Sequence, residues 1–330
     1  MLKFFKHNYI AQLIVIVLLV VALWIPVFIS QVSEVAEGSP ATPLYNLIVH
    51  IFGHSSVAVS VLAFAVFITS VFFFNSMLSV NQLVTRNSSI GAFVFVLCVC
   101  CIPMQDEYYQ FILASPFIMI SIQTMFLLYQ VDKPEAYLMN AGFFIAVASM
   151  FYLPSIILIF WVLLAVMIMN MRGIKNYVTP LLGFTIPYFL LFVYFYFTRT
   201  LIENVEAYSL TLNELDFMKL DVKLSEIVVF IIDIILFLLS LLVIRSGNAD
   251  NSVSTRKKVG VSVLLFAFSV IMLFLQKPVM CNGLIYIVIA LFVSIALSYI
   301  KKSKIVDILL VIMMLAIVVN QYLPLFGIVL

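Results

Sequence analysis

Two pairs of acidic side chains are the residues best placed to do chemistry in this sequence. Glu34 and Glu37 are separated by two residues in a polar stretch, whereas Asp106 and Glu107 are adjacent. A partly desolvated carboxylate can act as a general base or as a ligand for a divalent metal. The competing interpretation is four solvated charges in loops, and the acids alone leave both interpretations open.

Asp233 is a different kind of candidate, because it lies inside an apolar segment. Two isoleucines precede it and two follow it. A carboxylate deep in a membrane is costly unless it is paired, protonated or facing water. We therefore expect Asp233 to be either a proton or substrate site, or one end of a structural hydrogen bond between helices.

These residues belong to a chain that is too apolar to be a soluble globular protein. Of its 330 residues, 65% are hydrophobic and 10% are charged, which would leave large apolar patches facing water. The net charge of +2 provides no basic field for nucleic acid. The composition therefore excludes a soluble enzyme, a disordered chain and a nucleic-acid binder. It predicts an all-α fold, a polytopic transmembrane helical bundle surrounded by membrane lipids.

Apolar runs of roughly 20 residues predict the helices that would cross the membrane. Eleven such segments are predicted, at about 10–30, 57–78, 90–103, 110–131, 137–152, 153–170, 177–198, 227–244, 259–275, 279–299 and 305–322. The loop at 31–56 contains a further apolar pattern of helical spacing at 44–53. We expect this pattern to form a short helix lying along the outer interface.

The basic residues predict how the bundle is oriented. If the N-terminus with Lys3 and Lys6 faces the cytoplasm, 13 of the 17 basic residues fall on the cytoplasmic side. Membrane insertion favours this asymmetry. The N-terminus is therefore predicted to be inside and the C-terminus outside, and ten of the 15 acidic residues then lie on the outer face.

The same scheme divides the chain into three parts. Residues 1–198 form an N-terminal membrane module that includes the outward loop and interfacial helix at 31–56. Residues 199–226 form an outward amphipathic loop, and residues 227–330 form a C-terminal membrane segment of four helices.

Proline and glycine are concentrated between positions 140 and 190. These residues are Gly142, Pro154, Gly173, Pro180, Gly183 and Pro187. Breaks in membrane helices either line cavities or permit kinks and close packing. Polar neighbours such as Asn140 and Tyr152 favour a pocket, and close packing is the alternative.

The sequence contains none of the common catalytic or phosphate-binding motifs that would identify an enzyme class. Phosphate-binding glycine loops, Walker motifs, zinc-protease helices and nucleophile elbows do not occur in the sequence. The four cysteines lack the spacing of metal ligands and lie in or beside apolar segments. They are Cys98, Cys100, Cys101 and Cys281. We expect them to be packing residues.

Two stretches, from Asn140 to Ser155 and from Met171 to Tyr188, resemble a family of bacterial multi-pass inner-membrane proteins known only as a domain of unknown function. The matching residues are Asn140, Gly142, Tyr152, Pro154, Arg172, Gly183, Phe184, Pro187 and Tyr188. The resemblance covers the N-terminal module and implies that the chain is located in the bacterial inner membrane.

More distantly, the layout is similar to the membrane module of GT-C glycosyltransferases, which move a sugar from a polyprenyl-phosphate carrier to an acceptor at the outer face. The resemblance implies that Glu34 and Glu37 lie in the first acidic outer loop, and that Asp106 and Glu107 lie in the second. The sequence departs from that family in two respects. Two residues separate the first acidic pair, and no large C-terminal soluble domain follows the bundle.

Three functions follow as hypotheses. A GT-C-like transferase would use an outward carboxylate as general base, with a divalent metal as a candidate cofactor, while Arg199 or Lys277 would hold the lipid phosphate. A transporter or flippase of a small or lipid-linked substrate would use Asp233 and the region of Asn140 and Tyr152. A non-catalytic subunit would bind partner membrane proteins through its apolar surfaces.

Overall fold

The computed structural model describes most of the chain. The described residues are 4–5, 9–29, 42–85, 88–101, 106–131, 133–202, 206, 208, 224–245, 252–273, 283–300 and 304–322. Of the predicted site residues, Glu34, Glu37 and Lys277 lie outside this part of the chain. The backbone of Asp106 and Glu107 is described, but their side chains are not.

Within these residues the secondary structure is helical, and the described segments contain no strand. The twelve α-helices are α2 (Tyr9–Ile29), α3 (Pro43–Ile51), α4 (Ser56–Val80), α5 (Ile90–Val99), α6 (Asp106–Leu127), α7 (Glu135–Phe151), α8 (Leu158–Ile168), α9 (Lys175–Phe197), α11 (Leu224–Val243), α12 (Val253–Leu273), α13 (Gly283–Tyr299) and α14 (Lys304–Tyr322). Two short 3-10 turns, Leu128–Gln130 and Leu153–Ile157, follow α6 and precede α8. The all-helical fold is therefore confirmed.

Each of the eleven predicted apolar segments falls on a helix, and the predicted interfacial segment falls on α3. Four helices, α2, α4, α6 and α9, are long and apolar enough to cross a membrane. Large apolar side chains cover their outer faces, such as Leu18 of α2, which is 62% exposed, and Phe189 of α9, which is 60% exposed. These features are compatible with a membrane protein. The number of spans stays a prediction.

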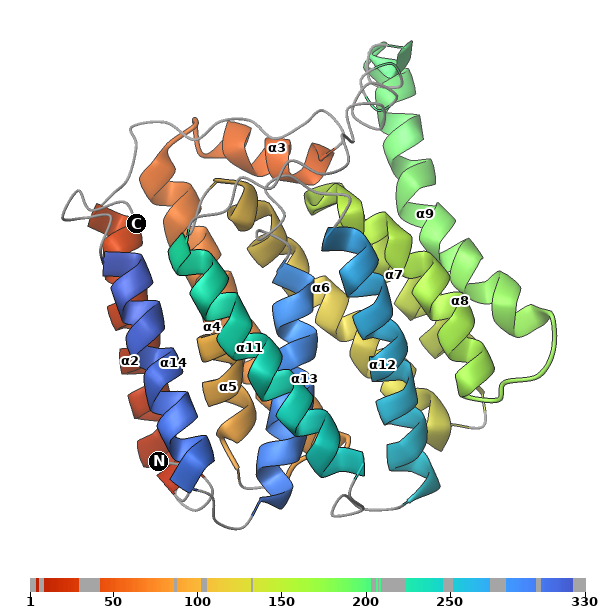
Figure 1. Ribbon diagram of the computed structural model, residues 1–330. Helices are drawn as coiled ribbons and strands as arrows, with labels where there is room; N and C mark the ends of the chain where they lie inside the picture. The colour runs from red at the N-terminus through yellow and green to blue at the C-terminus, as the bar shows by residue number, and fades with distance from the viewer. Residues whose placement is uncertain are drawn as a thin grey trace.

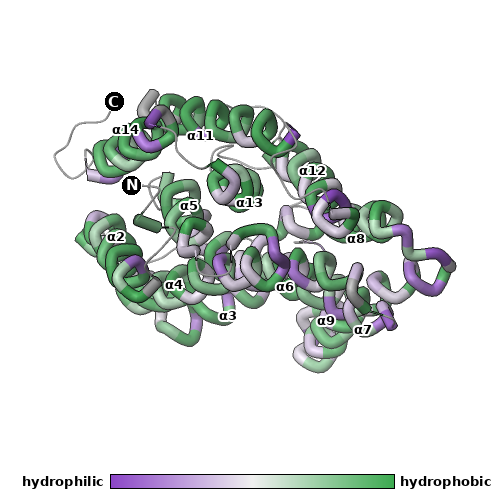
Figure 2. The backbone as a smooth tube through the Cα atoms, turned by 90° about the horizontal axis from the view of Figure 1, so that it is seen from below, coloured by the Kyte–Doolittle hydropathy of each residue, from purple (hydrophilic) through white to green (hydrophobic). Residues whose placement is uncertain are grey.

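The helices form an up-and-down bundle in which consecutive long helices run in opposite directions (Figure 1). α3 is the exception, because it lies across one end of the bundle, where α2 ends and where α4 and α6 begin. Seen along the bundle, α14, α11, α12 and α8 form one row, and α2, α4, α6, α7 and α9 form another (Figure 2). α5 and α13 lie between the rows.

The two central helices are enclosed along almost their whole length. All ten residues of α5 are buried, as are residues 283–297 of α13. Gly283 makes this packing possible at the start of α13, because a Cβ there would lie 2.0 Å from the ring of Phe111 on α6. Helices that are apolar all round belong in the interior of a bundle, which explains why neither helix shows an amphipathic pattern.

α12 begins earlier than the sequence predicted. The helix starts at Val253 instead of near 259, so it includes two adjacent lysines. Lys258 is 2% exposed, and its Nζ donates a hydrogen bond of 3.0 Å to the carbonyl of Asn81, which ends α4. Lys257 donates a 3.1 Å bond to the carbonyl of Met169, which ends α8, and lies over the ring of Tyr129. Each lysine of α12 donates to a carbonyl at the C-terminus of another helix. The two charged residues are therefore accommodated inside α12 and do not mark its start.

Candidate functional site

The most unusual polar site in the described chain surrounds the C-terminus of α5. With ten residues, α5 is about 15 Å long, less than half the length of the 25-residue α4 beside it. The residues at its C-terminus are buried, with Cys100 0% and Cys101 1% exposed, so its last carbonyls lie within the protein. Because no water or lipid can satisfy them there, they need donors from other helices.

Side chains from two helices supply these donors. Gln321 of α14 donates through Nε2 to the carbonyl of Cys100 at 2.8 Å, and Asn320 donates through Nδ2 to the carbonyl of Cys101 at 3.0 Å. The hydroxyl of Tyr108 on α6 donates to the carbonyl of Val99. The C-terminus of α5 is thus capped by one residue nine positions after Val99 and by two residues more than 200 positions further along the chain.

Asp233 of α11 lies at the same place. Its side chain is fully buried, and the Sγ of Cys101 lies 3.1 Å from its Oδ2. The thiol of Cys98, one turn earlier on α5, also faces the carboxyl. The other carboxyl oxygen, Oδ1, has no hydrogen-bond partner, and no described cation pairs with this group. Asp233 thus lies within an apolar helix, as predicted, and its polar neighbours are a thiol in the last turn of α5 and a thiol just after that helix.

The predicted substrate-binding residues are not gathered around Asp233. Asn140 is exposed on α7, and Arg199 is exposed just beyond the end of α9, where its backbone has a left-handed φ of 59°. Tyr152 is buried, and its ring packs edge-on against Phe111 at 5.5 Å. The ring centroid of Phe111 in turn lies 6.0 Å from that of Tyr108, which caps α5. Tyr152 is therefore linked to the end of α5 through two aromatic contacts.

The second candidate region is the end of the bundle beneath α3. Asp106 is the first residue of α6 and lies at that end (Figure 1). Part of this region is held by hydroxyl pairs between α4 and α6, including Ser60 with Tyr109 at 3.1 Å. In the described residues, no three His, Cys, Asp or Glu side chains come together as metal ligands.

Two pockets occur near the opposite end. One, of about 590 Å³, is lined by the last two residues of α4, Ser79 and Val80, by the segment Gln82–Thr85 after it, and by Ser298 and Tyr299 of α13. The other, of about 360 Å³, is an apolar groove between α11, α13 and α14. Neither is lined by Asp233 or by a residue of α3 or α6.

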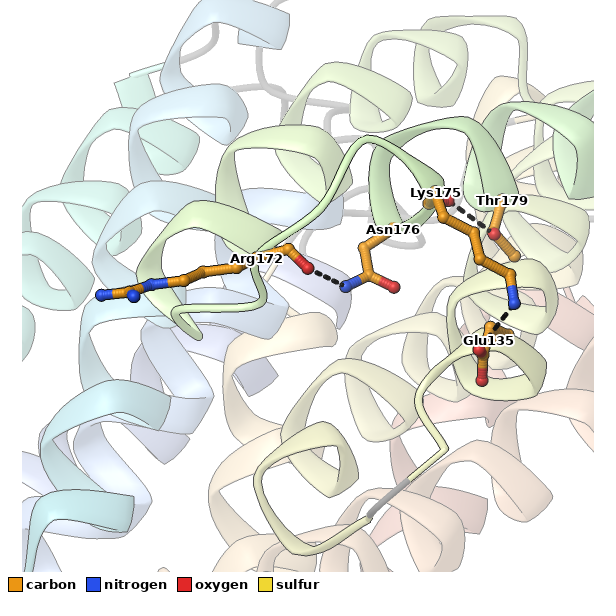
Figure 3. A network of polar contacts seen from close by, with 5 residues as sticks. All are labelled: Glu135, Arg172, Lys175, Asn176 and Thr179. Carbon is orange, nitrogen blue, oxygen red and sulfur yellow. Dashed lines mark hydrogen bonds and ion pairs between the residues drawn. The ribbon is translucent and has the colours of Figure 1, made fainter.

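The proline- and glycine-rich stretch forms a tight helix pair. A Cβ at Gly142 of α7 would lie 1.9 Å from the carbonyl oxygen of Pro180 on α9, and a Cβ at Gly183 would lie 2.1 Å from that of Met139. Of the two alternatives for this stretch, these contacts favour close packing. Figure 3 shows the basic end of the pair, where Lys175 of α9 forms an ion pair of 2.9 Å with Glu135 of α7.

We compared the chain with protein-family models, curated proteins and solved structures. None of them matches.

The sequence alone does not identify the groups that surround Asp233 and the C-terminus of α5. Asn320 and Gln321 stand at the end of an apolar run, where they look like interfacial residues. The three described cysteines, Cys98, Cys100 and Cys101, are buried and free, as packing residues would be. Their position beside Asp233 depends on where α5 ends. The sequence does not show that end, because the residues after Val99 are still apolar.

Proposed function

We propose that the chain is a multi-pass protein of the bacterial inner membrane and that the end carrying α3 faces outward. The support is an asymmetry between the two ends of the bundle. The described helix ends that carry Lys175, Arg245, Lys257, Lys258 and Lys304 lie opposite α3 (Figure 1). Lysine and arginine resist translocation, so the end that they occupy is the cytoplasmic end.

We further propose that the protein is a GT-C-like glycosyltransferase that transfers a sugar from a polyprenyl-phosphate carrier at the outer face. The observation that carries this proposal is the position of α3. It lies across the end of the bundle between the helix that precedes the first acidic loop and the helix that Asp106 opens. An interfacial helix beside two acidic loops is the arrangement that the resemblance to this class implies.

In this mechanism one of Glu34, Glu37, Asp106 and Glu107 removes the proton from the acceptor hydroxyl as the sugar leaves its carrier phosphate. Carboxylate oxygens are also the ligands that hard divalent cations prefer, so the same acids fit a metal that would neutralise the phosphate. Arg199, exposed beyond the outer end of α9, would bind the phosphate of the carrier, as would Lys277.

Complementation of a deletion strain tests this proposal. Glu34→Gln, Glu37→Gln, Asp106→Asn and Glu107→Gln are compared singly with wild type, and surface glycans are measured by mass spectrometry. At least one variant should lose transfer completely while its membrane level stays normal. Glu135→Gln, an acid at the opposite end of the bundle, is the matched control. Normal transfer by all four variants would show that the mechanism is wrong.

A carrier or flippase is the second candidate, and buried Asp233 favours it. In this case Asp233→Asn should stop transport, whereas the four outer acids should matter little. The enclosed centre formed by α5 and α13 favours a third candidate, a non-catalytic subunit. A partner that co-purifies stoichiometrically, with no activity in the isolated chain, would support the subunit.

A further inference from the structure

We infer that Asp233, Gln321 and the C-terminus of α5 form a binding site for a small monovalent cation, either Na+ or a proton. The inference is independent of the proposed transferase, because a bound cation can stabilise a membrane protein of any activity. It rests on the excess of buried acceptors over donors at this point of the bundle.

The hydrogen-bond donors around Asp233 are too few for the acceptors. Cys101 carries one S–H proton, but its Sγ lies 3.0 Å from the carbonyl of Leu97 and 3.1 Å from Oδ2 of Asp233, and the thiol of Cys98 supplies only one further proton to the same carboxyl. Oδ1 of Asp233 and Oε1 of Gln321 are both buried without a partner. Buried acceptors in native proteins are almost always satisfied, so two unpartnered oxygens on side chains that both bind the segment Cys100–Cys101 point to a positive ligand there.

The backbone adds to the negative potential. The C-terminus of a helix carries a partial negative charge of roughly half an elementary charge, and α5 places its own within the bundle. The carbonyls of Cys100 and Cys101 already accept one bond each from Gln321 and Asn320, but a carbonyl oxygen has two lone pairs. In secondary transporters, the C-terminal ends of half-helices and unwound backbone carbonyls coordinate Na+ or a proton.

No described group already neutralises the carboxylate. Lys304 and Asp307 of α14 lie in the first turn of that helix, at the opposite end from Gln321. The titratable side chains close to Asp233 are the thiols of Cys98 and Cys101, with Cys100 beside them, and the neighbouring elements add the hydroxyl of Tyr108 on α6 and Tyr286 of α13, whose ring lies 6.3 Å from Phe230. None of them is a cation. An unpaired charge at this depth is costly, so binding one positive charge is the simplest way to make the site neutral.

The experiment measures the reaction of Asp233 with dicyclohexylcarbodiimide, which modifies protonated carboxyls in apolar surroundings. The purified full chain is labelled in detergent over a range of pH, in NaCl or in choline chloride of equal ionic strength. Peptide mass spectrometry locates the label. Labelling of Asp233 should slow as the pH rises. If the site takes Na+, NaCl at ten times the dissociation constant should slow labelling about tenfold. If it takes only a proton, the two salts should give equal rates.

Melting temperatures provide the second readout and do not depend on access of the reagent. Wild type should respond to pH, or to Na+ against choline, in a way that Asp233→Asn does not. Gln321→Met, which removes the unpartnered oxygen, should weaken that response. Asn320→Leu is the matched control, because it removes a cap on α5 but leaves both unpartnered oxygens, and it should keep the response. If wild type and Asp233→Asn respond identically to pH and to Na+, the proposal is overturned.

Discussion

α5 and α9 are held in the bundle in opposite ways. All ten residues of α5 are buried, and side chains from other helices bind the backbone at both of its ends. Asn75 of α4 accepts a bond from the amide of Ala92 at 3.2 Å near the start, and Asn320 and Gln321 donate at the end. α9 buries only Pro180, Gly183 and Pro187 among its 23 residues, and its backbone touches that of α7.

The difference shows which interactions are available at each place. Lipid tails are as apolar as the side chains of a bundle, so moving an apolar side chain from lipid into the bundle gains little free energy. At the edge of such a bundle, close backbone approach at small residues therefore holds a helix pair together. At the centre, a helix that ends inside the bundle must have its free backbone groups satisfied by side chains. The edge pair should therefore be sensitive to added volume, and the centre should be sensitive to lost hydrogen bonds.

The largest effect is expected from added volume in the edge pair. Gly142→Ala and Gly183→Ala each place a methyl group about 2 Å from a carbonyl oxygen on the facing helix. The clash is with backbone, so the two helices would have to move apart to relieve it. Overpacking of this kind should cost roughly 3 kcal/mol, measured as a loss of thermal stability in detergent. Gly260→Ala on α12 is the control. Its Cβ would lie 3.4 Å from a side-chain methyl of Ile168, so that variant should be neutral or slightly stabilising.

A smaller effect is expected from the cap on α5. Asn320→Leu keeps the side-chain volume similar but leaves the carbonyl of Cys101 without its donor, which should cost about 1–3 kcal/mol of unfolding free energy. Asn176→Leu is the matched control. Asn176 donates a bond of the same kind, 2.9 Å long, to the carbonyl of Arg172, but that bond is exposed and water can replace it. Equal losses in the two variants would contradict the special role of the buried cap.

The sequence predicted the parts of this comparison that depend on local composition. Apolar runs located every long helix, because hydropathy is a property of each segment alone. For the glycines of α7 and α9 the sequence left a pocket and close packing as alternatives, because which helix they contact is set by the fold. The end of α5 was placed near 103, because the residues after Val99 are as apolar as those before it.

The site at Asp233 was predicted only in part, for the same reason. An acid between four isoleucines is conspicuous in one sequence, whereas its surroundings come from segments far from it. Cys101 is 132 positions away from Asp233, and Gln321 is 221 positions away from Cys100. A pattern confined to neighbouring residues contains no information about such pairs.

A third prediction concerns Lys258 of α12, whose ammonium group donates to the carbonyl at the C-terminus of α4. Lys258→Met removes the donor to the carbonyl of Asn81 and also removes a buried ammonium group, whose own desolvation is unfavourable. The two changes oppose each other, so the net loss should be about 1 kcal/mol, measured by thermal unfolding. Lys258→Arg keeps the charge and donors and is the control. A loss as large as that of Gly142→Ala would show that this cap holds the bundle together.

The smallest effect is expected from the ion pair that joins α7 and α9 (Figure 3). Lys175 is 76% exposed, and its ammonium donates to Glu135, which lowers the pKa of that carboxyl below its ordinary value. A lowered pKa stabilises the fold only above the pKa of the unfolded chain, and this contribution disappears as the pH falls through the folded-state pKa.

Lys175→Met should therefore leave the melting temperature almost unchanged at neutral pH, because exposed pairs contribute little, and should reduce the loss of stability on acidification. Glu135→Gln should behave in the same way. Melting curves of both variants and wild type from neutral to acidic pH would check this. A large loss at neutral pH would mean that charge, and not the contact of Gly142 and Gly183 with the facing backbone, holds α9 against α7. The contrast between the edge and the centre would then be wrong.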